Sequence, residues 1–143
     1  RQIVDEYIKR LSGYCKPEVI ELPEQKLPDT PSAGQIQNAL EKEAKLIREK
    51  IPQGAAVIAM CVEGKTMSSE QLAQTIGNLT VSGTSKLAVL IGGSCGLDEG
   101  LKREAKIRLS MSPMTFPHHL ARVMVLEQIY RALNIQEGGK YHK

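Results

Sequence analysis

The sequence predicts an α/β fold built on a parallel sheet, and three features support this prediction. Residues 55–62 (AAVIAMCV) and residues 86–93 (KLAVLIGG) are continuous apolar runs without polar alternation. This pattern is typical of strands that are covered on both faces in a parallel sheet. Each run precedes a segment with helical features, and such alternation favours an α/β layered architecture. The 143 residues contain no repeat, low-complexity tract or linker, so we expect a single domain, residues 1–143.

The N-terminal third is predicted to hold two helices and a short strand. Apolar residues at helical spacing indicate an amphipathic helix near the start: Ile3, Tyr7, Ile8 and Leu11. Residues 17–24 (PEVIELPE) have the apolar content and flanking prolines of a short strand. A loop rich in proline follows, and Ser32 is predicted to cap a helix over residues 35–50.

The remaining elements continue the alternation of strands and helices. Residues 65–83 predict a helix with Ser68 or Ser69 as its cap, and residues 97–109 predict a weaker helix. Pro117 suits the first turn of a C-terminal helix because its missing N–H would be unpaired there, with Thr115 as the expected cap.

Composition narrows the classes of function. Only 3% of the residues are aromatic, which argues against a stacking platform for single-stranded nucleic acid, and the net charge of +3 permits a polyanionic partner without requiring one. No apolar segment is long enough to cross a bilayer. Cys15, Cys61 and Cys95 are widely separated and form no CxxC pair. This cysteine pattern predicts a cytoplasmic protein without a metal site.

The segment LIGGSCGL directs attention to the end of the second apolar strand, because ligands of open α/β sheets bind beyond the carboxyl ends of the strands. Its glycines lack the spacing of a dinucleotide fingerprint, and no phosphate-gripping lysine follows. Gly92, Ser94 and Gly96 do spell GxSxG, the nucleophile elbow of serine hydrolases, with His118 or His142 as the candidate base. The alternative reading is a tight turn that needs glycine. A serine hydrolase and a non-enzymatic RNA-binding module therefore both remain alternatives.

The C-terminal helix is apolar well beyond one face. Leu120, Val123 and Met124 begin a stripe that Val125 and Leu126 widen, so the helix must be covered on two sides. A second subunit would supply this cover in a homodimer, whereas neighbouring helices of the same chain would supply it in a monomer. The apolar pattern is equally consistent with the homodimer and with the monomer.

Three segments together resemble a known family. LIGGSCGL, LSMSPMTFPHHLARVMVLEQIYRAL and the terminal YHK are similar to the corresponding parts of the bacterial 23S ribosomal RNA (pseudouridine-N3) methyltransferase family, small members of the SPOUT superfamily of knotted methyltransferases. The resemblance runs from the first helix to the last residue. It implies a parallel-sheet α/β knot, in which the C-terminal segment forms a trefoil knot, and a homodimer packed through the C-terminal helix.

The resemblance also implies a cofactor, S-adenosylmethionine, held largely by backbone groups. The family's cofactor contacts fall on a set of residues at the ends of three segments: Met60, Gly92, Met111, Ser112, Pro113, Met114, Thr115 and Phe116. A glycine turn without a lysine suits this cofactor because its adenosyl and methionyl parts carry no phosphate.

The implied reaction methylates N3 of a pseudouridine in 23S ribosomal RNA, in the assembled ribosome. His142 is the expected base or proton acceptor, Tyr141 is expected to position the nucleobase, and Arg122 to stabilise the developing anion. Arg131 and Lys143 are expected to contact RNA. By default, Arg131 also forms a modest ion pair with Glu127, four residues earlier on the helix.

One departure from the family concerns the start of the chain. The family begins with a strand and a Gly-Lys turn before the first helix, whereas this sequence opens directly on helical residues. We therefore expect an N-terminally incomplete domain that lacks the first strand, with an exposed sheet edge as the consequence.

Overall fold

The computed structural model describes residues 2–137. Its elements follow one another in this order: α1 (Gln2–Leu11), α2 (Ala33–Lys50), β1 (Ala56–Thr66), α3 (Ser69–Val81), β2 (Leu87–Leu90), α4 (Glu99–Glu104), β3 (Ile107–Ser110) and α5 (His118–Gln136).

The three strands form a parallel sheet in the order β2-β1-β3, so the first strand of the described chain lies at the centre. Ala59 of β1 pairs with Leu90 of β2, and Met60 pairs with Leu109 of β3. The predicted parallel sheet is therefore confirmed. Because all three strands run the same way, their carboxyl ends lie at one edge of the sheet.

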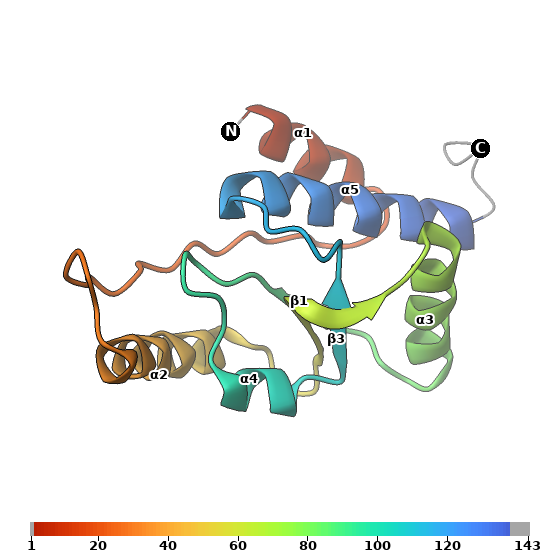
Figure 1. Ribbon diagram of the computed structural model, residues 1–143. Coiled ribbons are helices and arrows are strands. Elements are labelled where there is room, and N and C mark those ends of the chain that lie inside the picture. The colour runs from red at the N-terminus through yellow and green to blue at the C-terminus, as the bar shows by residue number, and fades with distance from the viewer. Residues whose placement is uncertain (1, 138–143) are drawn as a thin grey trace.

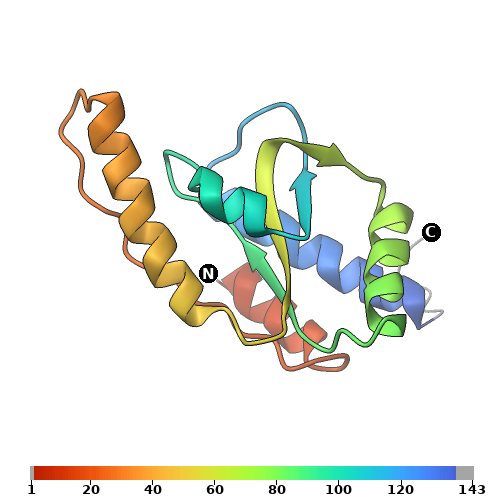
Figure 2. The same cartoon turned by 90° about the horizontal axis from the view of Figure 1, so that it is seen from below.

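Helices cover both faces of this sheet, as the uniformly apolar strands require (Figures 1 and 2). Ile58, 1% exposed, packs with residues of α3 and α5 on one face. Ala59, its neighbour on β1, points to the opposite face and packs with Ala44 of α2 and Leu101 of α4. Successive side chains of a strand point to opposite faces, so one short apolar run supplies both halves of the core.

Two helices of the same chain cover α5, namely α1 and α3. Tyr130 of α5 lies between the rings of Tyr7 and Tyr14, at centroid distances of 6.5 and 5.9 Å. On the side toward α3, Ala132 is fully buried. Of the two readings left open for this apolar helix, cover by neighbouring helices of the chain is therefore present, although Leu120 remains 48% exposed.

Two of the predicted elements are wrong. Residues 97–109 do not form one helix: α4 ends at Glu104, and Ile107–Ser110 is β3, paired with β1. Ladder hydrogen bonds and the burial of Leu109 and Ser110 outweigh the local helical pattern there. Residues 17–24 form no strand, because this extended segment pairs with no strand of the sheet and makes side-chain contacts instead.

The predicted helix caps are partly confirmed. Ser32 and Ser68 each cap their helix in a reciprocal capping box, with Gln35 and Gln71 as the respective partners. Thr115 is not a cap, because α5 begins at His118 with Pro117 in the cap position and no side-chain cap. No helix within residues 2–137 is long and apolar enough to span a membrane.

Candidate active site

Three segments reach the carboxyl edge of the sheet side by side. Met60 lies on β1, Gly92 follows the end of β2 by two residues, and Met111 directly follows β3. Because β1 is central and pairs with both other strands, the segments after β2 and β3 flank it. The topology therefore brings the predicted cofactor residues to one edge from three separate parts of the sequence.

The segment after β2 is a tight turn that requires glycine. Gly93 and Gly96 form an isolated antiparallel bridge, with the Gly96 N–H donating to the Gly93 carbonyl at 3.0 Å. Gly96 has φ +81°, a conformation that side chains disfavour. A Cβ on Gly92 would overlap the backbone of Gly96. The closely folded backbone of this turn therefore requires glycine at both positions.

The segment after β3 is held by serine hydroxyl groups. Ser110 is 4% exposed, and its Oγ lies 3.0 Å from the carbonyl oxygens of both Val62 and Ser112. Ser112 Oγ in turn accepts from the Met114 N–H at 3.0 Å. These bonds tie the segment to β1 and to itself, so its shape is fixed without a regular element.

The predicted cofactor residues differ in how far they are covered. Met60 and Met111 line one small apolar cavity of about 10 Å³ in the core under α5. Ser112 and Phe116 are half-buried. Pro113, Met114 and Thr115 are exposed, Met114 by 70%. The structure thus brings Met60 of β1 and Met111, which follows β3, to one cavity, whereas the middle of the segment after β3 is exposed.

Glu24 links the glycine turn to the start of α5, which the sequence did not predict. Its Oε2 accepts from Ser94 Oγ at 3.2 Å, and its Oε1 lies 4.0 Å from Nδ1 of His118. A Cβ on Gly93 would overlap the Glu24 carboxylate. The extended segment before α2 therefore crosses the site and contacts both the glycine turn and the start of α5. No local pattern signals this, because the contact spans 70 residues of sequence.

The arrangement around Ser94 does not match a hydrolase triad. In such a triad, a histidine accepts the serine proton and a carboxylate orients the histidine. Here the carboxylate of Glu24 stands between Ser94 and His118, so the described His118 does not serve Ser94 as a base. Among the described residues the GxSxG segment forms the glycine turn of its alternative interpretation, and His142, the other candidate base, lies outside them.

The two predicted arginines of α5 are both paired with carboxylates. Arg122 donates to Glu21 at 3.1 Å, and this hydrogen bond lowers the pKa of Glu21. Arg131 donates to Glu127 at 2.7 Å, which confirms the expected ion pair along the helix. Arg122 is 23% exposed, and the described contact uses one of its nitrogens, so the guanidinium retains donors for a substrate.

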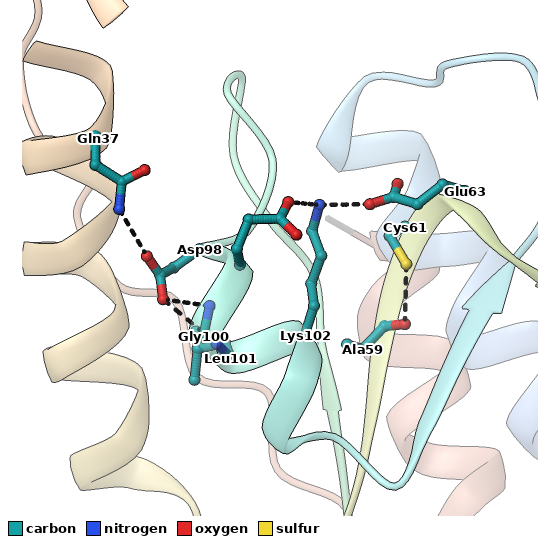
Figure 3. Close-up of polar contacts among 9 residues, drawn as sticks. Gln37, Ala59, Cys61, Glu63, Asp98, Gly100, Leu101 and Lys102 are labelled. Atoms are coloured by element: carbon teal, nitrogen blue, oxygen red, sulfur yellow. Dashed lines mark hydrogen bonds and ion pairs between the residues drawn. The ribbon is translucent and has the colours of Figure 1, made fainter. Parts of the chain in front are cut away.

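Polar contacts under the glycine turn fix α4, which follows it directly (Figure 3). Asp98 caps α4 by accepting from the N–H groups of Gly100 and Leu101, and Gln37 of α2 donates to the same carboxylate at 3.4 Å. Lys102, 11% exposed, donates to Glu63 of β1 at 2.6 Å. The turn is therefore anchored at its far end to both α2 and β1.

Burial lowers the pKa of Lys102, but hydrogen bonds to Glu63 and Glu99 outweigh it and leave the pKa raised. The same contact with Lys102 lowers the pKa of Glu63. Both groups are thus charged near neutral pH, and their attraction joins α4 to β1.

Tyr141, His142 and Lys143, which the sequence assigns to catalysis and RNA contact, lie outside the described residues. Within residues 2–137, no group of three or more potential metal ligands comes together. The three cysteines of the sequence are all described, and none forms a disulfide.

Comparison with known proteins places this architecture in a family. Residues 1–142 match the family model described as "Predicted SPOUT methyltransferase". The chain is 48% identical, over 98% of its length and 88% of the relative's, to ribosomal RNA large subunit methyltransferase H of Clostridioides difficile (strain 630).

Two further relatives agree with this match. The chain is 48% identical to ribosomal RNA large subunit methyltransferase H 1 of Clostridium perfringens (strain SM101 / Type A), over its full length and 90% of the relative's. It is 43% identical, with the same coverage, to ribosomal RNA large subunit methyltransferase H of Streptococcus equi subsp. zooepidemicus (strain MGCS10565). The chain therefore belongs to the SPOUT methyltransferase family, in the group of the ribosomal RNA large subunit methyltransferases H, and is a methyltransferase.

Proposed function

We propose that this methyltransferase transfers a methyl group from S-adenosylmethionine to N3 of a pseudouridine in 23S ribosomal RNA, in the assembled ribosome. The observation that carries the proposal is the meeting of Met60, Gly92 and Met111 at one sheet edge in a chain of the SPOUT family. The names of the relatives support ribosomal RNA as the substrate.

The site fits the proposed cofactor. The closely folded backbone at Gly92 and Gly96 would approach the cofactor, and Met60 and Met111, which line one apolar cavity, would add apolar cover. S-adenosylmethionine carries no phosphate, so it needs close backbone approach and apolar cover more than a lysine. When bound there, it supplies an activated methyl group on a sulfonium. Gly92, Met60 and the residues from Met111 to Phe116 would hold it.

The residues of α5 and of the C-terminus would act on the nucleobase. The imide N–H at N3 is weakly acidic, so its loss needs a proton acceptor, the role proposed for His142. Arg122 would stabilise the resulting anion through its remaining N–H donors. Tyr141 would orient the ring, and Arg131 and Lys143 would contact RNA phosphate. Alignment of the nucleophile with the methyl carbon supplies most of the rate effect.

We further infer a homodimer through α5. Although α1 and α3 cover two of its sides, apolar residues of α5 retain accessible surface, with Leu120 48% exposed. A second copy would bury this surface in an isologous contact. Sedimentation of the purified chain tests the dimer.

We also infer that the segment after β3 threads the loop after β2 to form a trefoil knot, an exception among protein folds. The flanking of β1 by these two loops supports this topology. We also propose that the enzyme acts in the cytoplasm, where its proposed ribosomal RNA substrate would lie.

Incubating ribosomes with the protein and isotopically labelled S-adenosylmethionine, followed by mass spectrometry of the ribosomal RNA, tests the function. We expect one labelled pseudouridine in 23S RNA, and strong loss of label with His142→Ala. No transferred label from wild-type protein that binds the cofactor would contradict the substrate. Full activity of His142→Ala would remove that residue from the mechanism.

A further inference from the structure

A second, larger hollow lies beside the cofactor segment. It has a volume of about 370 Å³ and lies between the start of α3, the end of β3 and the middle of α5. Met111 lines both this hollow and the small cavity that Met60 lines. Its volume lies within the range of small-molecule sites, and its shared wall places it next to the proposed methyl donor.

The walls of the hollow are soft and carry little net charge. Met67, Met111 and Met124 present thioether side chains, which adapt to flat rings and contact them favourably. The charged residue in the lining, Glu127, is already satisfied by Arg131 at 2.7 Å and by the Tyr7 hydroxyl at 3.0 Å. A neutral heterocycle suits this lining better than a phosphate, because no lysine or arginine of residues 2–137 lines it.

The side-chain amide of Gln128, which lines the hollow, is held in one orientation. Ser69 Oγ donates to Gln128 Oε1 at 2.6 Å, so the amide oxygen of Gln128 is occupied. No acceptor within residues 2–137 bonds the Nε2 group of Gln128. The amide therefore offers a donor whose orientation the Ser69 hydroxyl sets.

We propose that this hollow receives the target base, turned out of the RNA, with Gln128 Nε2 donating to a carbonyl oxygen beside N3. This inference rests on the proposed function. Enzymes that modify a base must extract it from its stack, and they read its Watson–Crick edge by hydrogen bonds. In a uracil-type ring, two carbonyls flank N3. Cytosine presents an amino group at one of these positions. This amino group and the Gln128 Nε2 amide group would both be hydrogen-bond donors, so they could not bond each other.

The test compares variants of the full chain that keep the volume of the side chain. Gln128→Met removes the amide, Gln128→Glu replaces the donor by an acceptor, and Ser69→Ala frees the amide to turn. Gln74→Met is the control, because Gln74 is exposed on α3 and bonds only Asn78 among the described residues. The readouts are kcat/KM on ribosomes, the affinity for S-adenosylmethionine by calorimetry, and the melting temperature.

We expect Gln128→Met to lower kcat/KM roughly tenfold, since a buried carbonyl loses its partner. Gln128→Glu should lower it further and Ser69→Ala by a few fold. Cofactor affinity should stay within twofold for all variants, and Gln74→Met should match wild type. Gln128→Glu keeps the size of the side chain, so it still tests the role of the amide donor if Gln128→Met has a lowered melting temperature.

Three outcomes overturn the inference, and they are distinguishable. Wild-type kcat/KM in both Gln128 variants removes the residue from base recognition but leaves the proposed function intact. A large loss of cofactor affinity in both Gln128 variants assigns the hollow to the adenine of S-adenosylmethionine instead. Absence of methyl transfer by the wild type contradicts the proposed function itself, and the inference falls with it.

Discussion

The Ser94 hydroxyl donates a hydrogen bond to the Glu24 carboxylate at 3.2 Å. This contact joins the glycine turn after β2 to a segment that precedes α2 and belongs to no regular element. The same carboxylate lies 4.0 Å from Nδ1 of His118 at the start of α5. One side chain thus contacts both the glycine turn and the first residue of α5.

Glu24→Ala should weaken cofactor binding slightly. The lost contacts are partly exposed, so together they stabilise the binding-competent site by about 0.5 kcal/mol. Their loss corresponds to a two- to threefold rise in the Kd for S-adenosylmethionine. Calorimetry with S-adenosylmethionine measures it. Glu18→Ala, on the same segment and exposed, is the control and should leave Kd unchanged. Equal Kd values for Glu24→Ala and wild type would show that the segment does not order the site.

Ser94→Ala should retain methyl transfer. The hydroxyl contacts Glu24 instead of a histidine, and the proposed reaction gives it no proton to move. We expect kcat on ribosomes within about threefold of wild type, as for loss of one exposed hydrogen bond. An organophosphonate probe should leave Ser94 unlabelled. Labelling of this residue together with loss of activity would restore the hydrolase interpretation.

Gly92→Ala should disrupt the site. Its Cβ would overlap the Gly96 backbone, and relief requires the turn to open, at a cost of about 1–3 kcal/mol. We expect at least a tenfold loss of cofactor affinity by calorimetry. Gly34→Ala is the control, because its Cβ would meet only Ser32 Oγ at 3.9 Å within a helix. Unchanged affinity in Gly92→Ala would mean that the cofactor does not use this turn.

The contact between Glu63 and Lys102 should make stability depend on pH in acid. Lys102 holds the pKa of Glu63 below its ordinary value of 4.5, so the stabilisation is fully present above that value and is lost as the pH falls through the lowered folded-state pKa. At pH 7, the free energy of unfolding of Glu63→Gln should be about 0.2–1 kcal/mol below that of wild type, since the Glu63 side chain is half exposed.

Urea unfolding from pH 7 to pH 3 measures this difference. The gap between wild type and Glu63→Gln should close toward the acid end, while Glu41→Gln, exposed on α2, should show no gap at either end. A gap that stays constant over this range would show that the ion pair is not its source.

The fold was predictable where a local pattern coincided with burial. The apolar runs around Ile58 and Val89 predicted parallel strands, and both are strands of the sheet. β3 was missed because its four residues, IRLS, follow a charged helical segment and gain their stability from pairing with β1. Pairing partners 49 residues apart, such as Met60 and Leu109, leave no local signal.

The site was predictable only in part for a similar reason. The glycine turn after β2 was identified because it follows an apolar strand, whereas residues 111–116 were assigned to the cofactor by the resemblance to the methyltransferase family. The roles of Glu24 and of Gln128 depend on contacts between distant segments, which only the folded chain reveals. Residues 17–24 have a strand-like composition, yet their observed role is to cross the site.

The most direct test of the central claim is calorimetry of the folded chain with S-adenosylmethionine and with its demethylated product. We predict saturable heat with both ligands, which Gly92→Ala weakens and Gly34→Ala does not. A protein that melts cooperatively but gives no heat with either ligand would contradict a cofactor site at this sheet edge.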